Sequence, residues 1–258
     1  MTMFALPHFP AVDSVAEHKQ RDYFIAAFTF VTTTICLTTD GFAPQFMQYV
    51  LAFFGWLFLI AFLRGECKYV RTQVAVAILF AVVGEYFASI YMKGYVYRFE
   101  NVPVYVPAGH GLVYLTAVAL GRSGLFIQYA RRIAIFVVSI CGLWAFWGIS
   151  GWSQRQDVIG AILFGVFLLY LLKGRSPMVY LGAFFITSWL EIVGTSAGTW
   201  EWAVIDPASK LPQGNPPSGV AAWYCLVDAV AIAGAGPLLD LLSRTAKYFR
   251  NQQAMIGK

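Results

Sequence analysis

Long apolar runs dominate this chain. The segments 41–63, 101–121 and 133–154 contain no Asp, Glu, Lys or Arg. Each run approaches or exceeds the roughly 20 apolar residues that a helix needs to cross the hydrocarbon core of a bilayer. A spanning segment must satisfy its backbone internally, so it is either a helix or a strand of a closed barrel. Barrel strands alternate apolar and polar residues, whereas these runs are continuously apolar, which predicts helices.

The same pattern, followed along the whole chain, predicts an all-α polytopic membrane protein with about eight transmembrane helices. We place them at residues 23–39, 45–63, 73–93, 104–121, 132–151, 157–172, 177–197 and 218–242. The composition agrees, because only 12% of the residues are charged, about half the usual share of a soluble domain. Residues 1–22 are polar and lack the apolar core of a signal peptide. We expect them, with the tail 243–258, to lie in the cytoplasm.

The Lys and Arg residues fix the expected orientation. Of the 18, fourteen fall on the side that holds both termini and the 64–72, 122–132 and 173–176 segments. Basic loops stay in the cytoplasm, so both termini are expected there, in a multi-pass protein of the cell (inner) membrane. The net charge of +5 follows from this topology, and we expect no nucleic-acid partner. The other side holds the four remaining bases, Lys93, Arg98, Arg155 and Lys210.

The two halves of the chain resemble each other. Segment 52–65 aligns with 161–174 without a gap, and Glu85 and Glu191 each precede a glycine-aromatic turn and then a proline and a glycine. Four spans in each repeat give both repeats the same orientation, as in parallel-repeat transporters. We therefore expect two parallel four-helix repeats, residues 23–121 and 132–242, related by an axis along the membrane normal.

Four ionisable residues lie inside the predicted spans: Glu85, His110, Glu191 and Asp228. Such groups cost roughly 2.5–3.5 kcal/mol on insertion scales and usually face a cavity or a partner. We expect the four to line one cavity toward the outer face and to be catalytic. Two carboxylates there would not both ionise easily, so one should hold its proton near neutral pH. The alternative, that each only hydrogen-bonds between helices, stays open.

No metal or cofactor is indicated, because the sequence has no HxxxH, ExxH or HxxEH spacing of the kind that metal sites use. The outer connections 94–107 and 198–218 carry alternating aromatics, which point one way in an extended segment. We expect Tyr95, Tyr97, Trp200 and Trp202 to wall the cavity mouth and to bind substrate. An ordinary interfacial aromatic belt is the alternative. The Gly194–Gly198 pair forms a GxxxG pattern, which predicts close helix packing.

The segment around Glu191 resembles one known family. Glu191, Gly194, Thr195, Gly198, Trp200 and Trp202 occur in the order found in the membrane-integral carotenoid-biosynthesis hydratases of the bacterioruberin type. There an intramembrane Glu precedes a glycine-threonine, a glycine-aromatic turn and a proline. The resemblance covers about 35 of the 258 residues, and Glu85 lacks the glycine-threonine. It implies water addition to an isoprenoid double bond in the membrane, without a cofactor.

Three classes of function remain. The first is an intramembrane enzyme that acts on a lipophilic (isoprenoid or lipid) substrate, with Glu85 and Glu191 as acid and base. The second is a proton- or ion-coupled transporter that uses the same carboxylates as a relay, and the third is a structural or assembly subunit. A carrier needs polar paths to both faces, whereas the candidate residues lean outward, which favours the enzyme. The expected partners are the bilayer and a lipophilic small molecule, with a homo-oligomer or a membrane complex left open.

Overall fold

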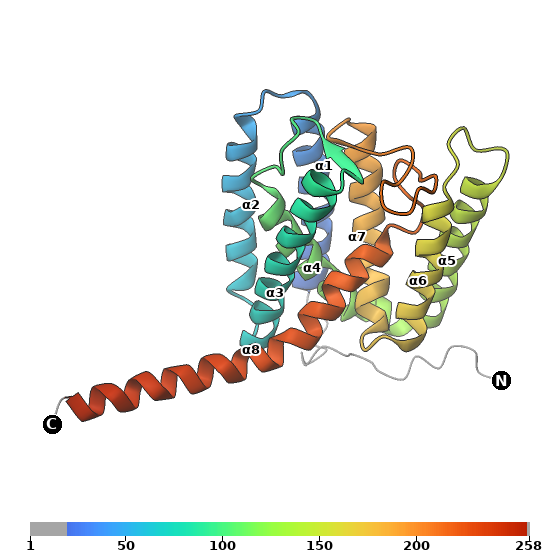
Figure 1. Ribbon diagram of the computed structural model, residues 1–258. Coiled ribbons are helices and arrows are strands. Elements are labelled where there is room, and N and C mark those ends of the chain that lie inside the picture. Colours follow the sequence, from blue (N-terminus) through green and yellow to red (C-terminus); the bar gives the residue numbers. More distant parts are fainter. Residues whose placement is uncertain (1–19, 257–258) are drawn as a thin grey trace.

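The computed structural model describes residues 20–256, with side chains described as far as Thr245. This part of the chain folds into a bundle of helices with one short two-stranded ribbon (Figure 1). The predicted N-terminal segment 1–22 lies almost wholly outside the described residues. The elements are α1 (Gln20–Phe42), α2 (Met47–Leu63), α3 (Lys68–Glu85), the π-helix η1 (Tyr86–Tyr91), β1 (Tyr95–Tyr97), α4 (Val106–Gly121), α5 (Gly124–Ile149), α6 (Val158–Lys173), α7 (Pro177–Ser196), β2 (Trp200–Trp202) and α8 (Ala221–Ile256).

The helices are those of a multi-pass membrane protein. Five are long and apolar enough to cross a membrane, namely α1, α3 continued by η1, α5, α7 and α8. The other three, α2, α4 and α6, are also apolar but have only 17, 16 and 16 residues. Eight segments thus follow the predicted apolar runs. Whether all eight cross the bilayer, and whether the halves are repeats, stay predictions.

Two helix boundaries differ most from the predicted ones. Helix α5 begins at Gly124 rather than at 132, because the Ser123 hydroxyl caps it by accepting a hydrogen bond from the backbone N–H of Phe126. A kink at Tyr129 (φ −113°, ψ 21°) joins this first turn to the spanning part. Helix α8 continues past the predicted end at 242 to Ile256 and projects from the bundle (Figure 1).

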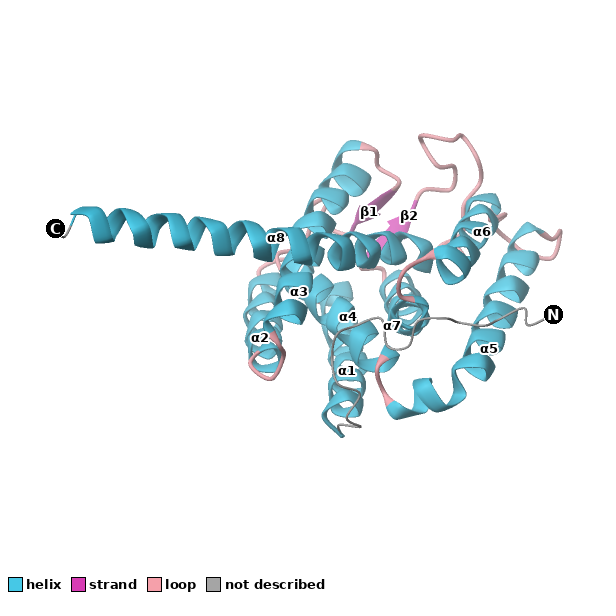
Figure 2. Cartoon of the chain, turned by 90° about the horizontal axis from the view of Figure 1, so that it is seen from below, coloured by secondary structure: helices cyan, strands magenta, loops and turns pink. Residues whose placement is uncertain are grey.

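The centre of the bundle consists of α4 and α7, with α3 against α4 and α8 (Figure 2). Small residues let α4 and α7 approach closely, since a Cβ atom added to Gly182 would lie 2.5 Å from the carbonyl oxygen of Ala117. Leu115, Ala117 and Val118 are fully buried at this crossing. A separate buried cluster, which includes Tyr97, Trp200 and Trp202, packs around the ribbon.

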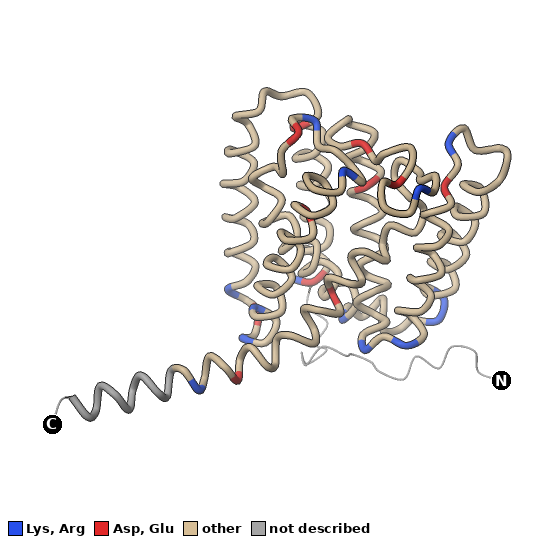
Figure 3. Tube along the Cα trace, in the orientation of Figure 1, with Lys and Arg blue, Asp and Glu red and all other residues tan. Residues whose placement is uncertain are grey.

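Charge is distributed unevenly along the bundle axis. Lys and Arg gather at the end where α2 and α6 finish and α3 and α7 begin (Figure 3); we call it the basic end. The ribbon of β1 and β2 lies toward the opposite end (Figure 1). The assignment of the basic end to the cytoplasm stays a prediction from the positive-inside rule.

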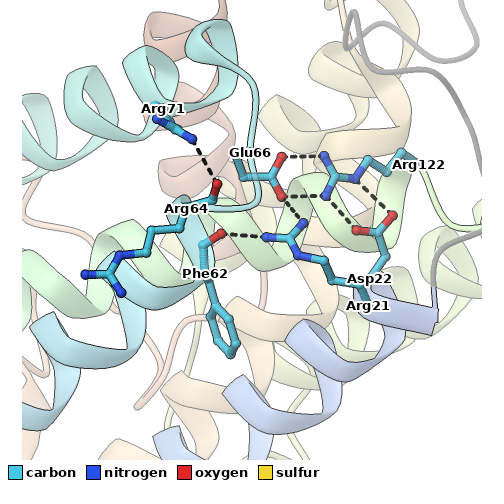
Figure 4. Close-up of polar contacts among 7 residues, drawn as sticks. All are labelled: Arg21, Asp22, Phe62, Arg64, Glu66, Arg71 and Arg122. Carbon is cyan, nitrogen blue, oxygen red and sulfur yellow. Dashed lines mark hydrogen bonds and ion pairs between the residues drawn. The ribbon is translucent and has the colours of Figure 1, made fainter.

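A buried ion network joins three segments at the basic end (Figure 4). The Arg122 guanidinium donates to both carboxylate oxygens of Asp22, at 2.6 and 3.0 Å, and to both of Glu66, at 2.7 and 2.8 Å. Arg21 donates to Glu66 and to the carbonyl oxygen of Phe62. Two bases and two acids leave the cluster electrically neutral, which is the condition for holding charges out of water.

The network also fixes the protonation of Glu66, which lies in the connection between α2 and α3. Burial alone would raise the pKa of Glu66, but hydrogen bonds and charges from Arg122 and Arg21 outweigh burial and lower it. Conversely, burial opposes the charge of Arg122, and the two carboxylates more than compensate, so its pKa is raised. Glu66 and Arg122 are therefore expected to carry their charges at neutral pH.

Candidate active site

Glu85 is the last residue of α3 before the helix widens into the π-helix η1. Such π segments are rare and often occur at functional sites. The Glu85 side chain is buried, and its Oε2 accepts hydrogen bonds from the hydroxyls of Tyr95, at 2.5 Å, and Tyr97, at 2.8 Å. Its Oε1 lies 2.8 Å from Nε2 of His110 on α4. Both carboxylate oxygens are thus occupied by partners from the first half of the chain.

Glu191 holds the corresponding place on α7 and is also buried. Its Oε2 accepts hydrogen bonds from the indole N–H groups of Trp200 and Trp202, both at 3.0 Å. Its Oε1 lies 3.3 Å from the hydroxyl of Tyr224 on α8. All three partners belong to the second half. The two carboxylates therefore have parallel settings, each with two ring donors from a strand and one ring from the following helix.

The strand donors belong to one antiparallel ribbon that crosses between the halves (Figure 2). Tyr95 pairs with Trp202, and Tyr97 pairs with Trp200. Their ring centroids lie 4.8 and 5.9 Å apart, respectively. Because alternate strand residues share a face, the four rings form one layer whose polar atoms point to the two carboxylates. The aromatics are thus placed as hydrogen-bond donors as well as walls.

Two arginines, seen in the sequence only as loop charges, anchor the ribbon from outside. Arg98 donates to the carbonyl oxygens of Asp40 and Ala43 at the end of α1, at 2.6 and 2.7 Å. Arg155 donates to the carbonyl oxygens of Trp202, Ala203 and Gln213. Arg155 is half-buried, and this burial lowers its pKa despite nearby acids. Both arginine side chains thus donate hydrogen bonds to backbone carbonyl groups that lie outside regular secondary structure or at its ends.

Gly194 and Gly198 shape the turn that brings Trp200 back to Glu191. A Cβ atom on Gly194 would lie 2.0 Å from the Trp200 ring, so glycine makes room for that indole. Gly198 lies beyond the end of α7 with a φ of +71°, a conformation that favours glycine. The predicted role of this GxxxG pair in helix packing is therefore wrong. Gly194 leaves space for the Trp200 ring, and Gly198 allows the turn that follows α7.

The two carboxylates face a cavity of about 920 Å³. His110, Glu85 and Glu191 line it together with Tyr224 and the four aromatics of the ribbon, and most of the other lining residues are apolar. No Lys or Arg from the described part of the chain is among them. The lining also includes the half-exposed side chains of Phe54, Phe87 and Trp223. A cavity with such a rim is accessible from the side of the bundle.

The rings of His110 and Tyr224 connect the two halves of the site. Their centroids lie 5.8 Å apart with the planes inclined by 28°. His110 contacts Glu85, and Tyr224 contacts Glu191. The two carboxylates are therefore joined through a stacked pair of rings rather than by a direct hydrogen bond.

Asp228, the fourth ionisable residue, is not in the cavity lining. It is buried on α8, four residues beyond Tyr224. The expectation that four residues line one cavity therefore fits the geometry of Glu85, His110 and Glu191 and fails for Asp228, because Asp228 lies a helical turn further toward the basic end. Tyr224 was not among the predicted site residues, because an uncharged tyrosine in an apolar run is not conspicuous.

No metal centre is apparent, since the described residues include no group of three or more His, Cys, Asp or Glu side chains able to hold an ion. Comparisons with protein-family models, with curated proteins and with solved structures found no match to this chain. The resemblance of the Glu191 segment to the hydratases therefore stays a hypothesis that rests on the sequence.

Proposed function

We propose that this protein is an intramembrane enzyme that performs acid/base chemistry on a lipophilic substrate of the isoprenoid or lipid class. The observation that carries the proposal is the placement of a Glu85–His110 pair and of Glu191 on the wall of one large apolar cavity. Polar groups that are few and convergent in an apolar pocket are the usual form of a small-molecule site. The half-exposed apolar rim suits a substrate that enters from the bilayer.

His110 is the proposed base, with Glu85 as its positioning residue. Glu85 already accepts two tyrosine hydrogen bonds, which favours its ionised form and a third donor at Oε1. The Nε2–H of His110 then donates to Glu85, which leaves Nδ1 with its lone pair free. This is the logic by which an acid orients histidine in hydrolase triads.

Glu191 is the proposed acid. An indole N–H only donates, so the two tryptophans occupy Oε2 and the carboxyl proton has to reside on Oε1, beside Tyr224. Transfer of that proton to an alkene carbon leaves a carbocation, which faces of aromatic rings stabilise. Water then adds to the cation and loses a proton to His110. The return of this proton to Glu191 completes a hydration, the reaction that the sequence resemblance implies.

The alternatives are less well supported by the packing. A carrier needs a connected polar path through the bundle. On the basic-end side of the cavity, α3, α4 and α8 meet mainly through fully buried apolar residues such as Ala77, Leu115 and Ala231. The buried polar atoms found there, including both side-chain polar atoms of Gln73 and Oδ2 of Asp228, have no hydrogen-bond partners among the described residues. A purely structural subunit does not need a cavity in which six ring side chains make hydrogen bonds to two carboxyl groups.

The test compares membrane lipids made in the presence of different variants. The gene is removed from its own host and restored as wild type, Glu85→Gln, Glu191→Gln or, as a folding-neutral control, Arg131→Gln, an exposed residue. Organic extracts are compared by untargeted mass spectrometry. The wild type and the control should contain lipophilic species heavier by one water molecule, with their lighter precursors accumulating in both Gln variants. Identical extracts from all strains, with folded protein present, would refute the proposal.

A further inference from the structure

A second, smaller hollow of about 310 Å³ lies on the face of the ribbon that points away from the cavity; we call it the outer hollow. Val96 and Glu201 line it and are paired across the two strands. Alternate strand residues point to opposite faces, so these two side chains point away from the four aromatics of the ribbon. The exposed residues of the lining are Val96, Arg98, Glu100, Gly198, Glu201 and Asn215. Charged side chains stay in water, so the outer hollow is an aqueous space at the end of the bundle opposite the basic end (Figure 1).

Two aromatic residues separate the outer hollow from the cavity. Tyr97 and Trp200 line both spaces, and each is only 6% exposed. They are paired in the ribbon, and their ring centroids lie 5.9 Å apart in an edge-to-face arrangement. Because the ribbon has two strands and no more, the division between the aqueous hollow and the cavity is one layer of backbone and rings at this point.

The same two aromatics contact both acids of the site. The Tyr97 hydroxyl donates to Oε2 of Glu85 at 2.8 Å, and the Trp200 indole N–H donates to Oε2 of Glu191 at 3.0 Å. A water molecule that passes between the two rings therefore arrives directly at the carboxyl groups. Each ring carries one polar group, so a transient loss of one hydrogen bond frees a ring to move aside.

The proposed hydration consumes water, which the bilayer side of the cavity is poorly suited to supply. The rim on that side contains half-exposed apolar side chains such as Phe54, Phe87 and Trp223. We propose that water enters the cavity from the outer hollow by passing between Tyr97 and Trp200. The lipophilic substrate and water thus reach the two acids from different sides. The need for water rests on the proposed function, whereas the route itself does not.

Hydroxyl-radical footprinting of the purified protein in nanodiscs tests this route without a substrate. Radicals made from water by an X-ray pulse oxidise the side chains that water reaches, and mass spectrometry locates the oxidised residues. Tyr224 is the reporter, because it lines the cavity and contacts Glu191. Val96→Trp fills the outer hollow and should lower the oxidation of Tyr224 severalfold. Val96→Thr, which keeps the size of valine, is the matched control and should leave it unchanged, and Trp152, 78% exposed, reports the radical dose.

The competing entrance is the rim at Ala208 in the 203–218 connection, which also belongs to the cavity lining. Ala208→Trp should leave the oxidation of Tyr224 unchanged. Protection of Tyr224 by Ala208→Trp and not by Val96→Trp would overturn the proposal, and so would a wild type in which Tyr224 is not oxidised at all. If Val96→Trp does not fold, Thr195→Leu fills the outer hollow from the end of α7 and decides in its place.

The footprint and the lipid extracts fail independently. The expected footprint beside identical lipid extracts from the wild type and both Gln variants would support the water route and refute the proposed function alone. Altered extracts in the Gln variants, beside a Tyr224 that Val96→Trp and Thr195→Leu do not protect, would refute the water route alone.

Discussion

The ion network at the basic end offers the sharpest stability prediction, through the substitution Arg122→Gln. The Arg122 side chain is 7% exposed, and its partners Asp22 and Glu66 are each 3% exposed. Substitution removes four charge-assisted hydrogen bonds and leaves two buried carboxylates with Arg21 as the remaining base. Breaking a buried ion pair by deleting one partner costs about 3–5 kcal/mol, mostly because the other charge stays buried and uncompensated. We expect a loss of that size in the free energy of unfolding.

Arg122→Lys separates charge from geometry. A lysine keeps the positive charge but cannot make the planar, two-sided contact of a guanidinium with two carboxylates. Arg122→Lys should therefore lower the free energy of unfolding, but by less than Arg122→Gln does. Arg131→Gln is the matched control, because Arg131 is a base at the same end but exposed; exposed substitutions of this kind usually stay within about 0.5 kcal/mol.

The assay is reversible unfolding in mixed micelles of increasing denaturing-detergent fraction, followed by circular dichroism. The reasoning predicts the order wild type, Arg131→Gln, Arg122→Lys and Arg122→Gln, from most to least stable. If Arg122→Gln unfolds with the same free energy as Arg131→Gln, the four charges are hydrated in the membrane-embedded protein, and the network does not hold the basic end together.

Three further predictions follow from other contacts. The arginines beside Glu66 lower the pKa of its carboxyl group. The stabilisation of the folded protein by this carboxylate is therefore complete above the ordinary carboxyl pKa of about 4.3 and is lost as pH falls through the lowered value. The free energy of unfolding, measured during acid titration, should show this loss in wild type and not in Glu66→Gln. Gly194→Ala should cost about 1–3 kcal/mol through overpacking and change the tryptophan emission, since the new Cβ collides with Trp200, whereas Gly165→Ala, where nothing lies within 4 Å, should do neither. Asp157→Ala removes the acceptor for the backbone N–H groups of Gly160, Gly214 and Ser218; it should cost about 1–3 kcal/mol and expose the 203–218 connection to protease, an effect that equal cleavage rates would rule out.

The sequence alone determined that the chain forms long apolar helices, and approximately where. The reason is local: in lipid a backbone must bond within its own segment, so an uninterrupted apolar run leaves few choices. The same local reasoning located Glu85 and Glu191, because an acid in an apolar run is conspicuous, and placed two pairs of aromatics on one strand face each. It also set the expected division of basic residues between the two ends.

Only the tertiary structure decided which of these groups meet. Asp22 and Arg122 are 100 positions apart, and no local pattern distinguishes a base that closes an ion network from one that lies exposed in water. Gly194 is recognisable as small, but only the path of the turn shows that its space belongs to Trp200. Asp228 is as conspicuous in the sequence as Glu191, yet it lies a turn beyond the cavity. Periodicity specifies how residues lie on one helix, whereas the contacts between helices depend on how every side chain at a crossing packs, and that information is spread over the whole chain.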